Sequence, residues 1–171
     1  MEHEVFDTAI VSLLVENESG ALARIIELFS GRGYNIDSLT VAPVDAFNKV
    51  SRVNIVTSGT PSTLSQIKVQ IERLVPVLRV VNLTVEGPYV AREMALVKVV
   101  SSGEMRAESL RIAEAFRARI VDTTAQSFIF ELTGSGDKLD SFIDLMRPLG
   151  LAEISRTGVA SICRGPQTIE G

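Results

Sequence analysis

The chain has 171 residues, of which 46% are hydrophobic and 22% charged, a globular composition that argues against disorder. Its formal net charge of −4 offers no electrostatic basis for binding nucleic acid or an anionic membrane surface. No uninterrupted apolar segment approaches the roughly 20 residues that are needed to cross a bilayer. The sequence starts without the basic and apolar regions of a signal peptide, and the single cysteine, Cys163, cannot form an internal disulfide. We therefore expect a cytoplasmic protein.

The residues that are missing also constrain the chemistry. With one histidine, His3, and one cysteine, the chain cannot assemble a zinc site from these two residue types, so we predict no metal site. A Ser–His or Cys–His dyad would have to recruit His3 from the N-terminus. The absence of tryptophan and an aromatic content of 5% disfavour stacking platforms for nucleic-acid bases. We predict no catalytic residue on this chain.

The first half of the chain predicts the element order β-α-β-β-α-β. Apolar runs and alternating patterns indicate strands, and apolar residues that recur at i, i+3, i+4 and i+7 indicate helices. The predicted elements are a strand over 8–16, a helix that stops at the glycines in 31–33, strands over 34–44 and 49–58 joined by a hairpin turn, a helix from Thr60-Pro61 to Pro76, and a strand over 77–86.

Each predicted helix in this half carries an apolar stripe, which marks the face to be buried. The first stripe is formed by Leu22, Ile25, Ile26 and Phe29, and the second by Leu64, Ile67, Ile71, Leu74 and Val75. We expect both helices to cover one face of the sheet and the other face to stay partly bare.

After Gly87-Pro88 the same order of elements begins again. The pattern predicts strands over 94–100, 119–124, 127–133 and 151–155, with helices over 104–117 and from Ser135 to Pro148. The fold class is therefore α+β, with two ferredoxin-like βαββαβ domains in tandem. We place the domains at 1–86 and 92–165, with a linker over 87–91 and a tail over 166–171, and expect partial order beyond residue 156.

The loop between the first strand and the first helix is the strongest candidate site. It contains Asn17, Glu18, Ser19 and Gly20, and the helix begins directly after it. Unpaired backbone N–H groups and the positive end of the helix dipole favour a small carboxylate at such a place. The alternative is an ordinary turn, in which Asn17 or Ser19 caps the helix and Gly20 supplies backbone freedom. Both interpretations use the same donors and are compatible.

Asn35, at the entry to the second strand, is the other candidate. Its side chain can donate and accept hydrogen bonds, which suits the ammonium and carboxylate of an amino acid, although Asn is also an ordinary turn residue. In the predicted topology the second strand lies at the sheet edge, which invites pairing with a second copy. Such pairing would bring Asn35 of one chain near the Asn17–Gly20 loop of the other.

Two further features have simpler interpretations. The segment Gly134-Ser135-Gly136-Asp137-Lys138 superficially suggests a phosphate loop but lacks its Gly-x-x-x-x-Gly-Lys-Ser/Thr spacing, so we interpret it as a helix start. Cys163 lies between Ile162 and Arg164 and is interpreted as an incidental thiol.

Two stretches together carry a family resemblance. They read Leu-Val-Glu-Asn-Glu-Ser-Gly-Ala-Leu at 14–22 and Arg-Gly-Tyr-Asn-Ile-Asp-Ser-Leu-Thr-Val-Ala at 32–42. With shorter stretches at 78–80, 92–99 and 138–142, the chain resembles the small regulatory subunit of acetohydroxyacid synthase, also called acetolactate synthase. The resemblance covers residues 8–165. It implies that the first domain is an ACT domain, an amino-acid-binding module of the ferredoxin-like fold.

The resemblance also implies a site and partners. It implies a homodimer through side-by-side ACT sheets that binds valine, or another branched-chain amino acid, at the interface. The matching effector positions are Asn17 and Gly20 of one chain and Asn35 of the other, flanked by Glu18, Ser19, Ala21, Leu22 and Ile36. The implied partner is the large catalytic subunit, which would hold the thiamine diphosphate, Mg²⁺ and flavin that are not expected here. The bare face of the ACT sheet is the surface that we expect to contact it.

Two other function classes remain as alternatives. A separate amino-acid sensor acting on transcription, such as a leucine-responsive regulator, would add a helix-turn-helix and a basic surface, and neither is present in the sequence. A small ferredoxin-like enzyme such as an acylphosphatase would need a glycine-rich phosphate cradle with an arginine, which is also missing. The resemblance therefore remains the favoured basis, and it implies a non-catalytic regulatory subunit that activates the large subunit and confers feedback inhibition by valine.

Overall fold

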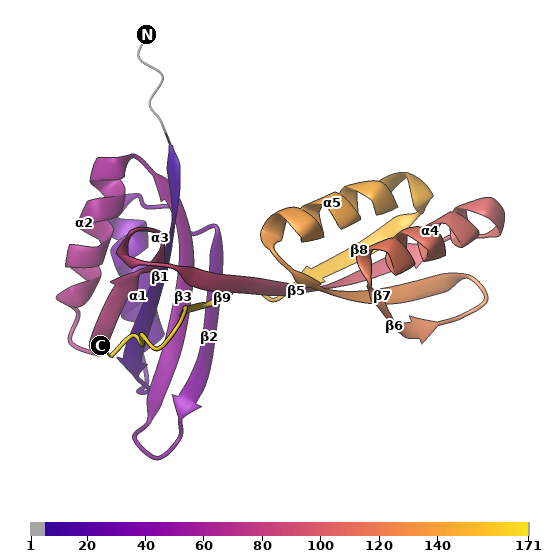
Figure 1. The fold of residues 1–171 in the computed structure, drawn as a ribbon. Helices are drawn as coiled ribbons and strands as arrows, with labels where there is room; N and C mark the ends of the chain where they lie inside the picture. The colour runs from indigo at the N-terminus through magenta and orange to yellow at the C-terminus, as the bar shows by residue number, and fades with distance from the viewer. Residues whose placement is uncertain (1–5, 171) are drawn as a thin grey trace, which may run out of the picture. The chain divides into compact units, whose positions relative to one another are not determined.

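The computed structural model describes residues 6–170, and the chain divides into two compact units (Figure 1). Unit 1 contains the residues up to Ala91 together with the C-terminal residues from Val159, and unit 2 is Arg92–Gly158. His3 lies outside the described residues. Within them, no helix is long and apolar enough to cross a membrane.

Unit 1 has the predicted ferredoxin-like order and ends with one additional short helix. Its elements are β1 (Asp7–Glu16), α1 (Ala21–Arg32), β2 (Ser38–Asp45), β3 (Val50–Gly59), α2 (Pro61–Glu72), β4 (Val77–Asn82) and α3 (Leu83–Glu86). The strands form an antiparallel sheet in the order β2-β3-β1-β4. Strand β2 therefore lies at the sheet edge, as the sequence predicted.

The core of unit 1 lies between the sheet and helices α1 and α2. Its fully buried side chains alternate along β1 and β3 and recur on the inner faces of the two helices, and they include Val11, Leu13, Val53, Ile55, Ile25, Phe29, Ile67 and Ile71. The predicted start of α2 is confirmed, because Pro61 occupies the first turn and the Thr60 hydroxyl accepts a hydrogen bond from the Thr63 N–H at 3.2 Å.

Two residues of the predicted apolar stripes are not buried. Ile26 is 41% exposed, because the inward line of α1 runs through Ala21, Ile25 and Phe29, which leaves Ile26 on the flank of the helix. Val75 is 84% exposed, because α2 ends at Glu72 and the chain has left the helical path before Val75. Both predictions extended helical periodicity beyond the surface that the sheet can cover.

Unit 2 repeats the same architecture. It contains most of β5 (Tyr89–Val100), followed by α4 (Gly103–Phe116), β6 (Arg119–Thr123), β7 (Ser127–Gly134), α5 (Gly136–Met146), the 3-10 turn η1 (Arg147–Leu149) and β8 (Leu151–Arg156). The strand order is β6-β7-β5-β8. Strand β5 begins inside the segment that the sequence analysis assigned to a linker. The core gathers Val97, Val99, Phe130, Leu132, Leu139, Phe142 and Met146 under α4 and α5.

The C-terminal segment corrects the expectation of a partly ordered tail. Residues 160–163 form strand β9 (Ala160–Cys163), which pairs with β5, and the residues from Val159 onward belong to unit 1. The boundary between the two compact units therefore lies after Gly158. We call residues 159–163 the C-terminal strap.

The strap is held to the sheet of unit 1 by polar contacts. The Val159 N–H donates to the Ser38 hydroxyl at 2.9 Å, and the Thr40 hydroxyl donates to the Val159 carbonyl at 3.2 Å. The Ser161 hydroxyl donates to Asn54 Oδ1 at 3.0 Å, and Arg52 Nη2 donates to the Ser161 carbonyl at 2.8 Å.

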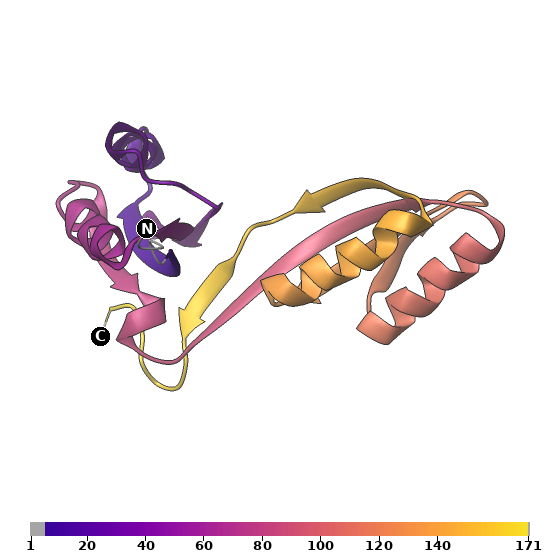
Figure 2. The ribbon, with the colours of Figure 1, turned by 90° about the horizontal axis from the view of Figure 1, so that it is seen from above.

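These contacts show that the second face of the sheet is not bare. The strap and α3 lie on the side of the sheet away from α1 and α2 (Figure 2). Ser12 and Asn54 are buried on this face, and Ser12 donates to Asn54 Oδ1 at 2.5 Å. Buried polar groups require hydrogen-bond partners, and the strap supplies part of them.

Candidate effector-binding site

The loop between β1 and α1 leaves the start of the helix open. Asn17, Glu18, Ser19 and Gly20 are all exposed. The helix cap is Gly20, with φ +85°, and no side chain forms a capping hydrogen bond. The suggestion that Asn17 or Ser19 caps the helix is therefore wrong. Without a side-chain cap, the N–H groups of Leu22 and Ala23 in the first turn remain available to an anion.

The backbone of this loop is anchored at both ends. The Asn17 N–H donates to the Lys49 carbonyl at 2.6 Å, which ties the loop to the start of β3. The Ala21 N–H donates to the Glu18 carbonyl at 3.3 Å. A methyl group on Gly20 would meet no heavy atom within 4 Å, so glycine is needed there for its positive φ and not for lack of space. Backbone hydrogen bonds therefore fix the shape of the loop, and its four residues are exposed.

The flanking predicted residues have different roles. Arg24, one turn into α1, forms an ion pair with Glu18 at 3.5 Å, so a cation lies beside the start of the helix. Ala21 is buried in the core of unit 1, and Leu22 is half-buried. Ala21 therefore supports the loop from inside and cannot touch a ligand with its side chain.

Asn35 lies beyond the other end of α1, after the left-handed cap Gly33. Its side chain is exposed, and its carbonyl accepts a hydrogen bond from the Thr57 hydroxyl at 2.6 Å. Its amide Nδ2 donates to Asp37 Oδ1. Ile36, the last predicted site residue, is partly buried and packs against the core of unit 1.

Asp37 contacts the candidate residue Asn35, and the sequence analysis did not single it out. Besides accepting from Asn35, its carboxylate accepts from the Ser58 hydroxyl at 2.5 Å, and its own N–H donates to the Val56 carbonyl at 2.8 Å. The Asn-x-Asp spacing could have indicated this contact, because Asn and Asp side chains readily bond to each other across two residues of a turn. Asp37 ties the entry of β2 to the end of β3.

One protomer does not bring the two halves of the predicted site together. The loop at Asn17–Gly20 precedes α1, and Asn35 follows it. A helix of 12 residues is about 18 Å long, which is more than a single amino acid can span. Within one chain, the predicted residues form two separate half-sites.

Two hollows of unit 1 lie away from the predicted effector residues. The largest described has about 370 Å³ and is lined by Leu14, Val50, Leu78, Arg79 and Glu170, and another of about 330 Å³ lies between β4 and the C-terminal residues 163–170. Neither contains a predicted effector residue.

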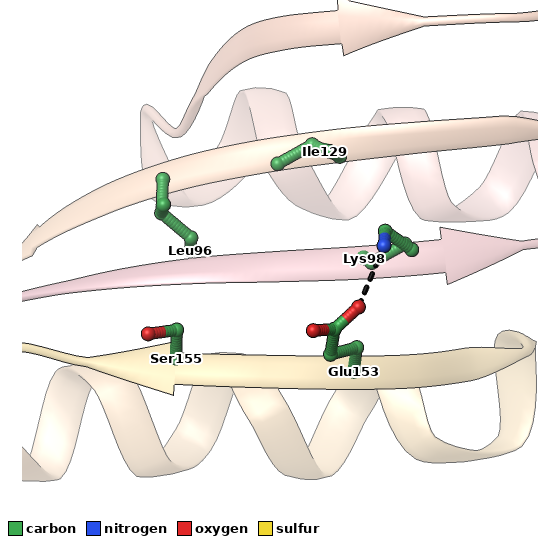
Figure 3. A pocket seen from close by; sticks show the side chains of 5 residues that line it. All are labelled: Leu96, Lys98, Ile129, Glu153 and Ser155. Atoms are coloured by element: carbon green, nitrogen blue, oxygen red, sulfur yellow. Dashed lines mark hydrogen bonds and ion pairs between the residues drawn. The ribbon is translucent and has the colours of Figure 1, made fainter.

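Unit 2 has a shallow depression of about 120 Å³ on the sheet face away from its helices (Figure 3). It is lined by Leu96, Lys98, Ile129, Glu153 and Ser155. Lys98 Nζ donates to Glu153 Oε2 at 2.6 Å, and this contact lowers the pKa of Glu153. The carboxylate therefore stays ionised near neutral pH and is unsuited to act as a general acid.

Other sequence features are also accounted for. The glycine-rich segment at 134–138 forms the start of α5, and the Lys138 side chain lies against Gly134. Among residues 6–170, no group of three or more His, Cys, Asp or Glu side chains is arranged to hold a metal ion.

Comparison with known proteins identifies the family. A profile described as the acetolactate synthase small-subunit-like ACT domain matches residues 11–79, and one described as the small subunit of acetolactate synthase matches residues 92–165. The acetolactate synthase isozyme 3 small subunit of Salmonella typhimurium is 48% identical over 157 residues, which cover 91% of this chain and 95% of that protein. This chain belongs to the acetolactate synthase small-subunit family.

Further relatives support this assignment. The acetolactate synthase small subunit of Haemophilus influenzae is 45% identical over 161 residues, which cover 94% of this chain and 98% of that protein. The crystal structure of the acetolactate synthase small subunit of Thermotoga maritima has a TM-score of 0.84 at 34% identity and covers 94% of this chain and 99% of that one. The resemblance found in the sequence is confirmed, and unit 1 is an ACT domain.

Proposed function

We propose that this chain is the regulatory small subunit of acetolactate synthase, which activates the large catalytic subunit and makes it sensitive to feedback inhibition by valine. The observation that carries the proposal is the family assignment, because the relatives match the chain along almost its whole length. In this proposal the reaction, with its thiamine diphosphate, Mg²⁺ and flavin, stays on the large subunit. The open start of α1 and the polar cluster at Asn35 support an effector role for unit 1.

The proposed effector site forms between two copies of the chain. Edge strand β2 exposes Val41 (43%) and Val44 (57%), and α1 exposes Ile26 (41%). An edge strand offers unpaired backbone groups, and pairing it with its own copy about a two-fold axis satisfies them. The same axis makes the two α1 helices antiparallel, so the start of one helix approaches the residues that follow the other.

This arrangement would complete the site. The N–H groups at the start of α1 would bind the carboxylate of valine. Asn35 of the partner subunit would bind the ammonium and carboxylate groups of the same valine from the opposite side. The branched side chain would contact the apolar surface of the interface. Ligand binding is thereby linked to the geometry of the dimer. A coupling free energy of about 1–3 kcal/mol would change effector affinity about 5- to 150-fold between the two states of the holoenzyme.

Calorimetric titration of the full chain with L-valine tests the site. We expect the variants Asn17→Ala and Asn35→Ala to lose binding, because each removes a polar group from one half-site. Asn48→Ala is the matched control, since Asn48 lies in the β2–β3 turn of the same unit, where it contacts Asp45. Normal valine binding by both site variants would refute the assigned site. Titrations with leucine and isoleucine would establish which branched-chain amino acid is preferred.

A second experiment tests the partner. A pull-down with the large subunit, followed by an activity assay with and without the small subunit, should show complex formation and activation. Valine added to the complex should then reduce activity. A chain that binds valine but neither binds nor activates the large subunit would be a separate amino-acid sensor.

A further inference from the structure

We infer that Asp37 is the specificity-determining residue of the effector site and selects α-amino acids over the 2-oxo acids of the same carbon skeleton. This inference rests on the proposed function. It assigns to Asp37 two tasks: its carboxylate attracts the ammonium group of the ligand, and it orients the Asn35 amide so that the amide oxygen faces the same group.

The orientation follows from the hydrogen bonds around Asp37. The Asn35 amide nitrogen donates to Asp37 Oδ1, so the amide oxygen is the end that remains for a ligand. The other carboxylate oxygen accepts from the Ser58 hydroxyl at 2.5 Å. Because Ser58 lies on β3 and the Asp37 N–H is bound to the Val56 carbonyl, two contacts from β3 hold Asp37 in place. Asn35 is thus presented as an acceptor by a rigid support.

The two half-sites offer a ligand opposite kinds of hydrogen-bonding group. At the start of α1, the Glu18 carboxylate is paired with Arg24. The groups that this half-site offers to a ligand are therefore hydrogen-bond donors, namely the helix amides and the guanidinium. Asp37 is exposed, and within residues 6–170 it takes part in no ion pair, since its described partners Asn35 and Ser58 are neutral. Its negative charge is therefore uncompensated. The two half-sites together match the carboxylate and the ammonium of a zwitterion.

This match gives the site a means of discrimination. A 2-oxo acid has the same carboxylate and side chain as the amino acid but carries a carbonyl oxygen in place of the ammonium group. That oxygen can only accept hydrogen bonds, so it would face the Asp37 carboxylate and the Asn35 oxygen without a proton to share. A regulatory site that rejects the oxo acid responds to the finished amino acid and not to a compound that lacks its nitrogen.

Titration calorimetry on the full chain tests the inference, with L-valine and 3-methyl-2-oxobutanoate as the two probes. We expect the unaltered chain to prefer L-valine by about 10- to 100-fold or more, the ratio that a hydrogen bond to a charged group supplies. Asp37→Asn keeps the shape of the side chain but removes its charge, and it should lose most of this preference through weaker valine binding. Ser58→Ala keeps the charge but removes one support, and it should lose a smaller part.

The matched control is Asp45→Asn. Asp45 also accepts from an asparagine amide three residues away, at 2.7 Å, but lies in the β2–β3 turn, and its variant should keep the full preference. If the unaltered chain binds no branched-chain amino acid, the proposed function fails together with this inference. If it binds L-valine and Asp37→Asn retains the same preference over the oxo acid, only this inference is overturned. Should Asp37→Asn fail to fold, as judged by circular dichroism, the loss of preference in Ser58→Ala decides the question alone.

Discussion

Units 1 and 2 share one architecture, and both sheets have a register shift at the same position. In unit 1 the register of β1 against β4 shifts between Leu14 and Val15, and in unit 2 the register of β5 against β8 shifts between Lys98 and Val99. Just beyond each shift, a strand N–H donates a hydrogen bond of 2.8 Å. The Glu16 N–H donates to the Pro76 carbonyl in unit 1, and the Val100 N–H donates to the Gly150 carbonyl in unit 2. The two halves can therefore be compared position by position.

The comparison shows that the second face of the sheet has diverged. In unit 1 the face away from α1 and α2 carries Ser12, which pairs with Asn54, and Arg52, and the C-terminal strap covers them. The equivalent positions in unit 2 hold Leu96, Glu131 and Ile129, where the open depression of Figure 3 lies. The two sheets share one topology, but they differ in whether a segment of the chain covers the second face. In unit 1 the polar side chains on that face bind the C-terminal strap, and in unit 2 the equivalent side chains leave the face open.

The largest difference expected between the units concerns Gly150, whose carbonyl accepts from Val100. It has φ +98°, and a Cβ there would lie 2.1 Å from the Val100 oxygen. We expect Gly150→Ala to destabilise unit 2 by about 4 kcal/mol, because the backbone would have to move to relieve the clash. The equivalent acceptor in unit 1 is the Pro76 carbonyl, and Pro76→Ala should cost less than about 1 kcal/mol. Urea unfolding combined with hydrogen exchange, resolved by peptide, separates the two units, and similar losses in both variants would contradict the comparison.

Removing residues 159–171 should expose the polar face of unit 1. The truncation deletes the five described side-chain hydrogen bonds of Val159 and Ser161, each with a net contribution of at least about 0.5 kcal/mol, so we expect a loss of about 3 kcal/mol. Peptides from β1, β2 and β3 should exchange faster, while those from α5 and β7 keep their protection. Equal loss of protection in both units would mean that the strap does not stabilise unit 1 selectively.

Unit 2 has a charged pair, Glu93 and Arg156, that unit 1 lacks at the equivalent positions. Glu93, which is only 7% exposed, accepts from Arg156 Nε and Nη2, both at 2.8 Å, and this contact raises the pKa of Arg156. Unit 1 has Ala9 and Asn82 at the equivalent positions. Glu93→Ala should destabilise unit 2 by about 2 kcal/mol, since it removes charge-assisted hydrogen bonds at a buried position. Arg156 Nη1 also donates to Asp140 Oδ1 at 2.6 Å, so Arg156 keeps one carboxylate partner in this variant. If Glu93→Ala is as stable as the unaltered chain, the two hydrogen bonds from Arg156 to Glu93 do not stabilise unit 2.

The smallest expected effect is a dependence of stability on acid pH. Lys98 lowers the pKa of Glu153 in unit 2. In unit 1, burial would raise the pKa of Glu86, but hydrogen bonds from the Lys68 ammonium and the Asn82 N–H lower it overall. A pKa below the ordinary value of 4.5 in the folded state means that the contribution is present above pH 4.5 and is lost as the pH falls further.

Both units should therefore lose a little stability between about pH 5 and pH 3. Glu153→Gln should flatten this dependence in unit 2 and leave that of unit 1 unchanged. Chemical unfolding at several pH values and constant ionic strength provides the measurement, and an unchanged slope in the variant would show that the Lys98–Glu153 pair does not contribute.

Local patterns in the sequence determined the tandem fold and pointed to one half of the candidate site. The apolar stripes, the Thr60-Pro61 start and the glycine after α1 depend on residues within one or two turns, so both βαββαβ orders and the edge position of β2 could be predicted. The loop at Asn17–Gly20 was identified for the same reason, because a strand, a glycine and a helix follow one another directly.

Only the tertiary structure decided which surfaces those elements expose. The strap joins Ser161 to Ser12 and Asn54, which lie more than a hundred residues earlier in the chain, and no local periodicity signals such a contact. The support of Asn35 by Asp37 depends on Ser58 of a neighbouring strand. Hydrogen bonds between distant residues form only after the sheet has set the register of its strands, so the sequence determined the elements while their packing determined which polar groups remain open to a ligand.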